Sequence, residues 1–223
     1  MKYETPLPDY VVVLAQACGE LSSFLGAARF NSKHLDHMFA VLYSGHVLEL
    51  IASILTLYKS SSHVGIPVLA RGVFETTVRI AYLANNPRKA EMEFELEDLL
   101  ERRKFHNEIL TVPQNSQVMN EEEVRKLTLK IETLQSNGVK VQNMQQRLKD
   151  LGATVNYSSF RFLSSFAHGQ LIALGSQSVL ASSDVNKVEL FRPLDEEFAR
   201  SLFRSLSLMT RKANEYAGRV LAA

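Results

Sequence analysis

Residues 61–87 read SSHVGIPVLARGVFETTVRIAYLANNP, and this stretch decides the fold class. It follows a serine-rich break and enters a helix near Pro67, because proline is favoured in the first helical turn. The helix is expected to end at Asn85, Asn86 and Pro87, since these residues stop helices. Apolar side chains between the two breaks flank a polar stripe at helical spacing. The stretch therefore predicts a helix of the kind that packs inside a bundle.

The same helical period continues on both sides of this stretch. Apolar residues step by three and four over residues 8–29 and again up to about Ser60, with Asn31 or Ser32 expected to cap the second helix. Residues 156–175 predict another core helix, and Asp195 is expected to cap a final amphipathic helix. A loop or short extended piece is expected over residues 184–193. The sequence therefore predicts an all-α helical bundle.

A long charged segment, residues 88–152, interrupts the bundle. Val124, Leu127, Ile131 and Leu134 step like a coiled-coil seam, and a second seam covers residues 141–151 in a shifted phase. A helical hairpin that turns at Asn137-Gly138 would explain the break, and one long helix with a stutter is the rival interpretation. We therefore divide the chain into residues 1–87 and 153–223, the two parts of the bundle, and 88–152, the charged helical insertion.

Composition excludes several classes of protein. The chain has 223 residues, 46% hydrophobic, and its formal net charge of +1 provides no global field for nucleic acid or anionic membrane. A single cysteine, Cys18, cannot form a disulfide within the chain and favours a reducing compartment. The N-terminus lacks a signal-peptide pattern, and the longest apolar run, residues 47–58, is too short to cross a bilayer. We expect a cytoplasmic protein without membrane contact.

The familiar cofactor and metal motifs are absent from the sequence. It has no glycine-rich phosphate loop, no paired-cysteine zinc site and no histidine-glutamate zinc helix. His34 and His37 lie three residues apart and could share a metal, but two histidines alone are weak ligands and a solvated helix face is more common. We therefore expect neither a metal nor a cofactor.

Two helices carry polar stripes that are candidates for a site. Tyr157, Arg161, Ser164, Ser165 and His168 fall within about 100° of arc on the helix that follows the charged insertion. Such a stripe cannot be a dry face, because burying an unpaired guanidinium is costly. It is either satisfied by partners or lines a cleft.

The earlier helix, within residues 61–87, carries a matching stripe. Arg71, Glu75, Arg79 and Tyr82 share one face, and Glu75 is placed to pair with either arginine along the helix. Glu75 could equally orient Arg161 or His168 across the bundle. We therefore expect these two helices to pack side by side.

The segments SSHVGIPVLARGVFETTVRIAYLANNP and YSSFRFLSSFAHG resemble an uncharacterised bacterial helical family, known only as a domain of unknown function. The spacing of Arg161 and His168, with six residues between them, also resembles the HEPN superfamily of helical bundles. Many members of that superfamily are metal-independent ribonucleases of toxin and antiviral systems, and a dimer usually builds their site. The resemblance implies that Arg161 holds the scissile phosphate and His168 acts as general acid or base. Ser164 or Ser165 would help to position the phosphate.

Three functions remain open on the sequence. The first is an RNA-directed, HEPN-like protein, either a ribonuclease effector of bacterial defence or a toxin, which acts as a homodimer and has an antitoxin or defence partner. The second is a non-catalytic helical module that binds a ligand or partner through the same polar cleft. The third is a structural oligomer joined through the charged arm. An internal hydrogen-bond network without chemistry is the alternative role for Arg161 and His168.

Overall fold

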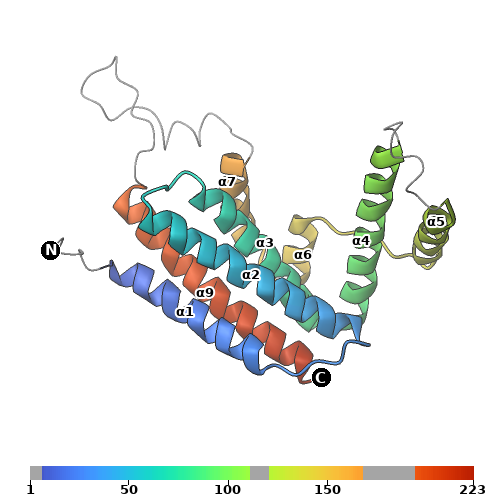
Figure 1. Ribbon diagram of the computed structural model, residues 1–223, viewed down its shortest axis with the longest axis horizontal. Coiled ribbons are helices and arrows are strands. Elements are labelled where there is room, and N and C mark those ends of the chain that lie inside the picture. The colour runs from blue at the N-terminus through green and yellow to red at the C-terminus, as the bar shows by residue number, and fades with distance from the viewer. Residues whose placement is uncertain (1–6, 111–120, 168–193) are drawn as a thin grey trace, which may run out of the picture.

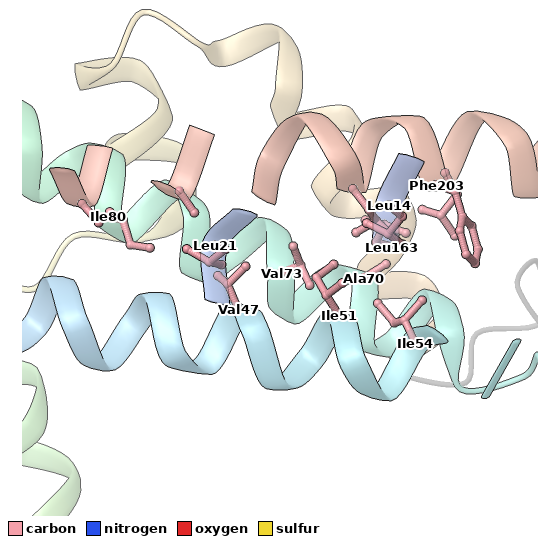
Figure 2. Close-up of a cluster of buried hydrophobic side chains, with 14 of the residues drawn as sticks. Leu14, Leu21, Val47, Ile51, Ile54, Ala70, Val73, Ile80, Leu163 and Phe203 are labelled. Carbon is pink, nitrogen blue, oxygen red and sulfur yellow. The ribbon is translucent and has the colours of Figure 1, made fainter. Parts of the chain in front are cut away.

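The computed structural model describes residues 7–110, 121–167 and 194–223, and every regular element in these residues is helical (Figure 1). Helices α1 (Asp9–Ala27), α2 (Leu35–Lys59), α3 (Ile66–Asn85) and α9 (Glu196–Leu221) form the main bundle. Their apolar faces meet in one core, to which α7 (Tyr157–Ala167) adds Leu163. Figure 2 shows side chains of these helices converging there. The predicted all-α bundle is confirmed.

Helix α3 lies at the centre of the molecule, between its two predicted breaks. It contacts α2, α9, α7, α4 and α6, and buried residues occur on most of its circumference. A Cβ added at Gly72 would lie 3.0 Å from Leu50 Cδ1, so glycine allows the close approach of α2. The starts of α3 and α9 are also joined, because Leu194 N–H donates to His63 Nδ1 at 3.0 Å.

The caps of α2 and α9 differ in how well the sequence predicts them. Helix α9 begins as predicted, with Asp195 Oδ1 accepting from Phe198 N–H at 3.0 Å. Helix α2 begins at Leu35 with His34 as its N-cap, so the expected cap at Asn31 or Ser32 was wrong. Asn31 Oδ1 instead accepts from Lys33 N–H at 3.0 Å, which forms a turn before the helix.

The charged segment forms two helices that leave the bundle as an arm, α4 (Pro87–Leu110) and α5 (Glu121–Ser136) (Figure 1). Ile131 of the first predicted seam packs on Leu96 and Leu99 of α4. The helix ends at Ser136, and Gly138 adopts a positive φ of 79° that suits glycine. A single long helix is therefore excluded, but α5 pairs with the preceding helix and not with the one after Asn137-Gly138.

The second predicted seam belongs to the bundle. Helix α6 (Met144–Asp150) places Leu148 against Phe74 and Val78 of α3, while Val141 is exposed. A short 3-10 turn, Thr154–Asn156, then leads into α7. At the other end of the charged segment, Phe94 of α4 is part of the main core. The compositional boundary near residue 88 is therefore not a boundary in packing.

Helices α1 and α2 are each long and apolar enough to cross a membrane, as judged by length and composition alone. The expectation that no segment is long enough considered only the uninterrupted run of residues 47–58, whereas α2 has 25 residues. Core helices of soluble proteins share these properties, and one face of each helix contributes to the main core here.

Candidate functional site

The polar stripe of α3 is a ladder of ion pairs. Arg71 and Arg79 flank Glu75, with closest nitrogen–oxygen distances of 3.8 and 3.6 Å respectively. Arg79 also donates two hydrogen bonds to the carboxylate of Glu97 on α4, both 2.7 Å long. The pairing of Arg71 with Glu75 is therefore present, but the strongest partner of the stripe comes from the arm.

The ladder continues into a buried cluster where α3, α4 and α6 meet. Arg147 of α6, 2% exposed, donates to Glu93 Oε1 at 2.7 and 3.0 Å and to Glu97 Oε2 at 3.1 Å. Glu93, 1% exposed, also accepts from Tyr82 O–H at 3.2 Å and from Gln142 N–H at 2.9 Å. We call Arg79, Glu93, Glu97 and Arg147 the buried charge cluster.

Electrostatics keep the Glu97 carboxylate of this cluster ionised. Burial raises the pKa of Glu97, but its hydrogen bonds and charge interactions with Arg79 and Arg147 outweigh that effect, and the pKa lies below its ordinary value. The carboxylate therefore remains ionised at neutral pH. Because every charge in the cluster has an opposite partner, its evident role is to attach α4 and α6 to α3.

Sequence reasoning missed Glu93, Glu97 and Arg147. Glu93 and Arg147 lie 54 residues apart, within a segment where most helix faces carry charges. The sequence signal that could have found them is the pair Glu93 and Glu97, four residues apart and next to Phe94. A buried apolar neighbour marks the inward face of α4. That signal alone does not identify the partner.

The stripe of α7 is arranged differently from that of α3. Arg161 is exposed and makes no ion pair or hydrogen bond with the residues that the structure describes. Ser164 and Ser165 donate to the carbonyl oxygens of Phe160 and Phe162 in their own helix, at 2.8 and 2.6 Å. Tyr157 is half-buried, and His168 lies outside the described residues. The proposed pairing of Arg161 with His168 stays a prediction.

Helices α3 and α7 do pack side by side, as predicted, but the contact is aromatic. The rings of Phe74 and Phe160 lie 5.7 Å apart. The guanidinium of Arg71 lies 5.3 Å from the Phe160 ring centroid, a cation–π contact. The polar stripe of α3 therefore contacts α7 through the ring of Phe160.

An open groove of about 920 Å³ runs between α3, α7 and α9, with α6 along one side. We call it the α3–α7–α9 groove. Its buried floor is apolar, and exposed serines stand along its rim. The floor includes Ala70, Phe74, Val78, Leu163, Leu202 and Leu206, and the rim includes Ser158, Ser159, Ser201 and Ser205.

Charged and amide groups gather where α3 and α9 end. Lys212 and Arg219 line the groove there, with Arg219 Nη2 donating to Asn85 Oδ1 at 3.3 Å. Asp150 of α6 also lines this end and accepts from Lys89 Nζ at 3.0 Å. Hydrogen bonds from Lys89, Gln142 and Gln146 lower the pKa of Asp150 to about 2. The groove thus combines an apolar length with a charged end.

Those sequence-predicted site residues that the structure describes do not line this groove. Ser158, Ser159, Phe162 and Leu163 present its α7 wall, whereas Tyr157, Arg161, Ser164 and Ser165 occupy other positions of the same helix. Phe162 is 47% exposed, which is unusual for a large apolar side chain. The apolar face beside this stripe was not predicted, because the stripe was defined by its polar residues.

Comparison with known proteins places the chain in a family but gives no activity. No curated protein and no solved structure matches it. One family model matches residues 37–187, which is roughly two thirds of the chain and runs from α2 through the arm to α7. The chain therefore belongs to the Family of unknown function (DUF5677).

Proposed function

We propose that this chain is a ligand-binding helical module whose binding site is the α3–α7–α9 groove. The groove's open volume carries the proposal, because about 920 Å³ is within the range of pockets that hold small molecules. Such pockets are mainly apolar with a few polar groups that orient the ligand. The buried floor and the serine rim have this composition.

The lining also indicates the class of ligand. An elongated apolar molecule would cover the floor formed by residues such as Leu163 and Leu206. Rim hydroxyls can donate and accept hydrogen bonds along its length. Lys212 and Arg219 at one end would favour a negatively charged head group. We therefore propose a ligand with an apolar body and an anionic end.

Two fluorescent probes test this proposal in the full chain. Anilinonaphthalene sulfonate has an apolar body and an anionic end, and Nile red is a neutral apolar control. Ser159→Trp and Ser205→Trp each add a large ring at the exposed rim. Ser53→Trp is the matched control, because Ser53 is an exposed helical serine that does not line the groove.

We expect saturable binding of both probes that either rim tryptophan abolishes and Ser53→Trp preserves. Lys212→Ala with Arg219→Ala should weaken binding of the sulfonate probe but leave Nile red affinity nearly unchanged, because the neutral probe gains nothing from the cations. Probe binding that survives both rim substitutions would refute the groove as the binding site.

A second candidate function is a HEPN-like, metal-independent ribonuclease of bacterial defence. The exposure of Arg161 favours it, because this guanidinium has no carboxylate partner among the described residues and a guanidinium can donate two hydrogen bonds to a phosphate. On this proposal RNA is the substrate, His168 transfers the proton, and an antitoxin or defence protein is the partner. The enzyme would need no cofactor.

An RNA cleavage assay decides between the two functions. A ribonuclease of this kind would cleave in the presence of chelator and leave 2′,3′-cyclic or 3′-phosphate ends. His168→Ala should then slow cleavage by about 10²–10⁴, and Arg161→Lys should fail because an ammonium cannot hold two phosphate oxygens in a planar fork. RNA that stays intact under wild-type protein at high concentration would refute the ribonuclease.

We propose in addition that the chain acts as a cytoplasmic homodimer joined through the arm of α4 and α5. Exposed Phe105 and Leu129 on these two helices support this, at 60% and 65% exposed. Light scattering should give twice the chain mass of 25.1 kDa at tens of micromolar. A monomer at that concentration would contradict the proposal.

A further inference from the structure

Potential metal ligands gather at the start of α2, far along the sequence from the groove helices α7 and α9. His34, Asp36 and His37 each offer one ligand atom, and these atoms lie within 4.8 Å of one another. The donors of a tetrahedral zinc lie about 3.4 Å apart, because each is about 2.1 Å from the ion. The three side chains are exposed or half-buried, so small rotations can close this gap.

The hydrogen bonds at this cluster leave donor atoms available. Asp36 Oδ1 accepts from His37 N–H at 2.9 Å, and His37 Nδ1 accepts a long hydrogen bond of 3.3 Å from Asn31 N–H. Within the described residues, His34 has no hydrogen bond to either ring nitrogen. Its ring lies 5.2 Å from that of His37. A metal bound at His37 would compete with the Asn31 contact, which is weak at this length.

The types of ligand suit a transition metal. Two imidazoles with one carboxylate form a ligand set that zinc and other divalent transition metals accept, with water in the fourth position.

Charge supports the same conclusion. The N-terminus of a helix carries partial positive charge and disfavours a cation. At α2 the carboxylate of Asp36 in the first turn opposes this effect.

We infer that His34, Asp36 and His37 form a binding site for a divalent transition-metal ion such as zinc. The site would fasten the turn before α2 to the first turn of that helix. Three protein ligands leave the fourth position of a tetrahedral ion to water, and the site is independent of ligand binding in the groove.

Calorimetric titration of zinc into the untagged, chelator-treated full chain tests the site. We expect one ion per chain, and cobalt should give the visible absorption of a tetrahedral complex. His34→Ala, His37→Ala and Asp36→Asn should each weaken binding at least about tenfold, the loss usual even for outer residues of metal sites. His46→Ala is the matched control, because His46 lies on the same helix and pairs with Glu49 at 4.0 Å.

Thermal melting provides a second measurement. Zinc should raise the melting temperature of wild type and of His46→Ala by mass action, but not that of the double variant of His34 and His37. The metal-free melting temperatures should agree, because neither histidine is buried in the core. Absence of stoichiometric binding, or binding that the double variant retains, would overturn the site.

Discussion

The two sides of α3 differ in how completely their side chains are paired or packed in the folded protein. Toward α4 and α6, the buried charge cluster places each carboxylate against a guanidinium at 2.7–3.1 Å. Toward α7 and α9, the α3–α7–α9 groove leaves open space beside a buried apolar floor, and Phe162 and Leu208 line it with exposed apolar side chains. Density of charge is therefore a poor guide to function in this molecule. Paired charges hold helices in place. Apolar side chains that line an open groove can still gain free energy by burying surface against a ligand.

The largest expected effect is on the cluster side. Arg147→Ala leaves Glu93 buried without its cation, so we expect it to lower the free energy of unfolding by about 3–5 kcal/mol. Arg161→Ala, on the exposed part of α7, should change it by less than about 0.5 kcal/mol. Urea denaturation of both variants measures the contrast.

Replacing the whole pair sharpens that contrast. Glu93→Leu combined with Arg147→Met exchanges two buried charges for apolar side chains, and should recover most of the lost stability. Equal destabilisation by Arg147→Ala and Arg161→Ala would mean that the two arginines have the same role, contrary to our account.

A smaller loss is expected for Arg79→Lys. The lysine keeps the charge but cannot donate the two parallel hydrogen bonds to Glu97, so a loss of about 1–3 kcal/mol is expected. Arg102→Lys is the control, because Arg102 pairs with Asp98 at 2.8 Å on an exposed face of α4. Thermal denaturation should show almost no change for the control. Similar losses of stability in both variants would mean that the buried position of Arg79 does not strengthen its pairing with Glu97.

Whether a feature of these two sides could be predicted from the sequence depends on how far apart in the chain its interacting residues lie. The bounds of α3 and the cap at Asp195 depend on neighbours within a few residues, and both were predicted. The first coiled-coil seam was also predicted, but its partner was not, because helical period does not say which helix covers a face. Glu93 and Arg147 meet only after α4 and α6 have docked on α3.

The candidate site was harder to predict than the fold. Arg71, Glu75 and Arg79 were correctly grouped because they share one helix face. The groove is a gap between three helices, and no residue pattern within one helix encodes a gap. His168 lies outside the described residues, so the ribonuclease prediction stays open. Asp36 was overlooked beside His34 and His37 because carboxylates are common near helix starts.

Acid should weaken the cluster side selectively. The folded-state pKa of Glu97 lies below its ordinary value, so its stabilisation is complete above the unfolded pKa of about 4.3 and is lost as pH falls through the folded pKa. Glu97→Gln should therefore be less stable than wild type at pH 7 and nearly equal to it in strong acid. Asp150, whose pKa is lowered to about 2, contributes in the same direction and remains in the variant. A constant difference between the two proteins across pH would contradict this assignment.

The smallest effect on stability is expected in the groove. Leu208→Ser replaces a groove residue that is 61% exposed, so the free energy of unfolding should change by less than about 0.5 kcal/mol. Binding of Nile red should nevertheless weaken, because the substitution removes apolar contact area. Denaturation and probe titration on the same sample separate the two effects. Unchanged probe affinity would remove Leu208 from the proposed site.

Methyl-detected NMR of the full chain, titrated with anilinonaphthalene sulfonate, tests the central claim most directly. It reports on both sides of α3 in one experiment. We predict saturable shifts of the methyl signals of Leu163, Leu206 and Met209 in the groove, with Leu96 and Ile131 of the arm unchanged. Shifts confined to the arm, or no saturable shift in the groove, would contradict the assignment of the α3–α7–α9 groove as the binding site.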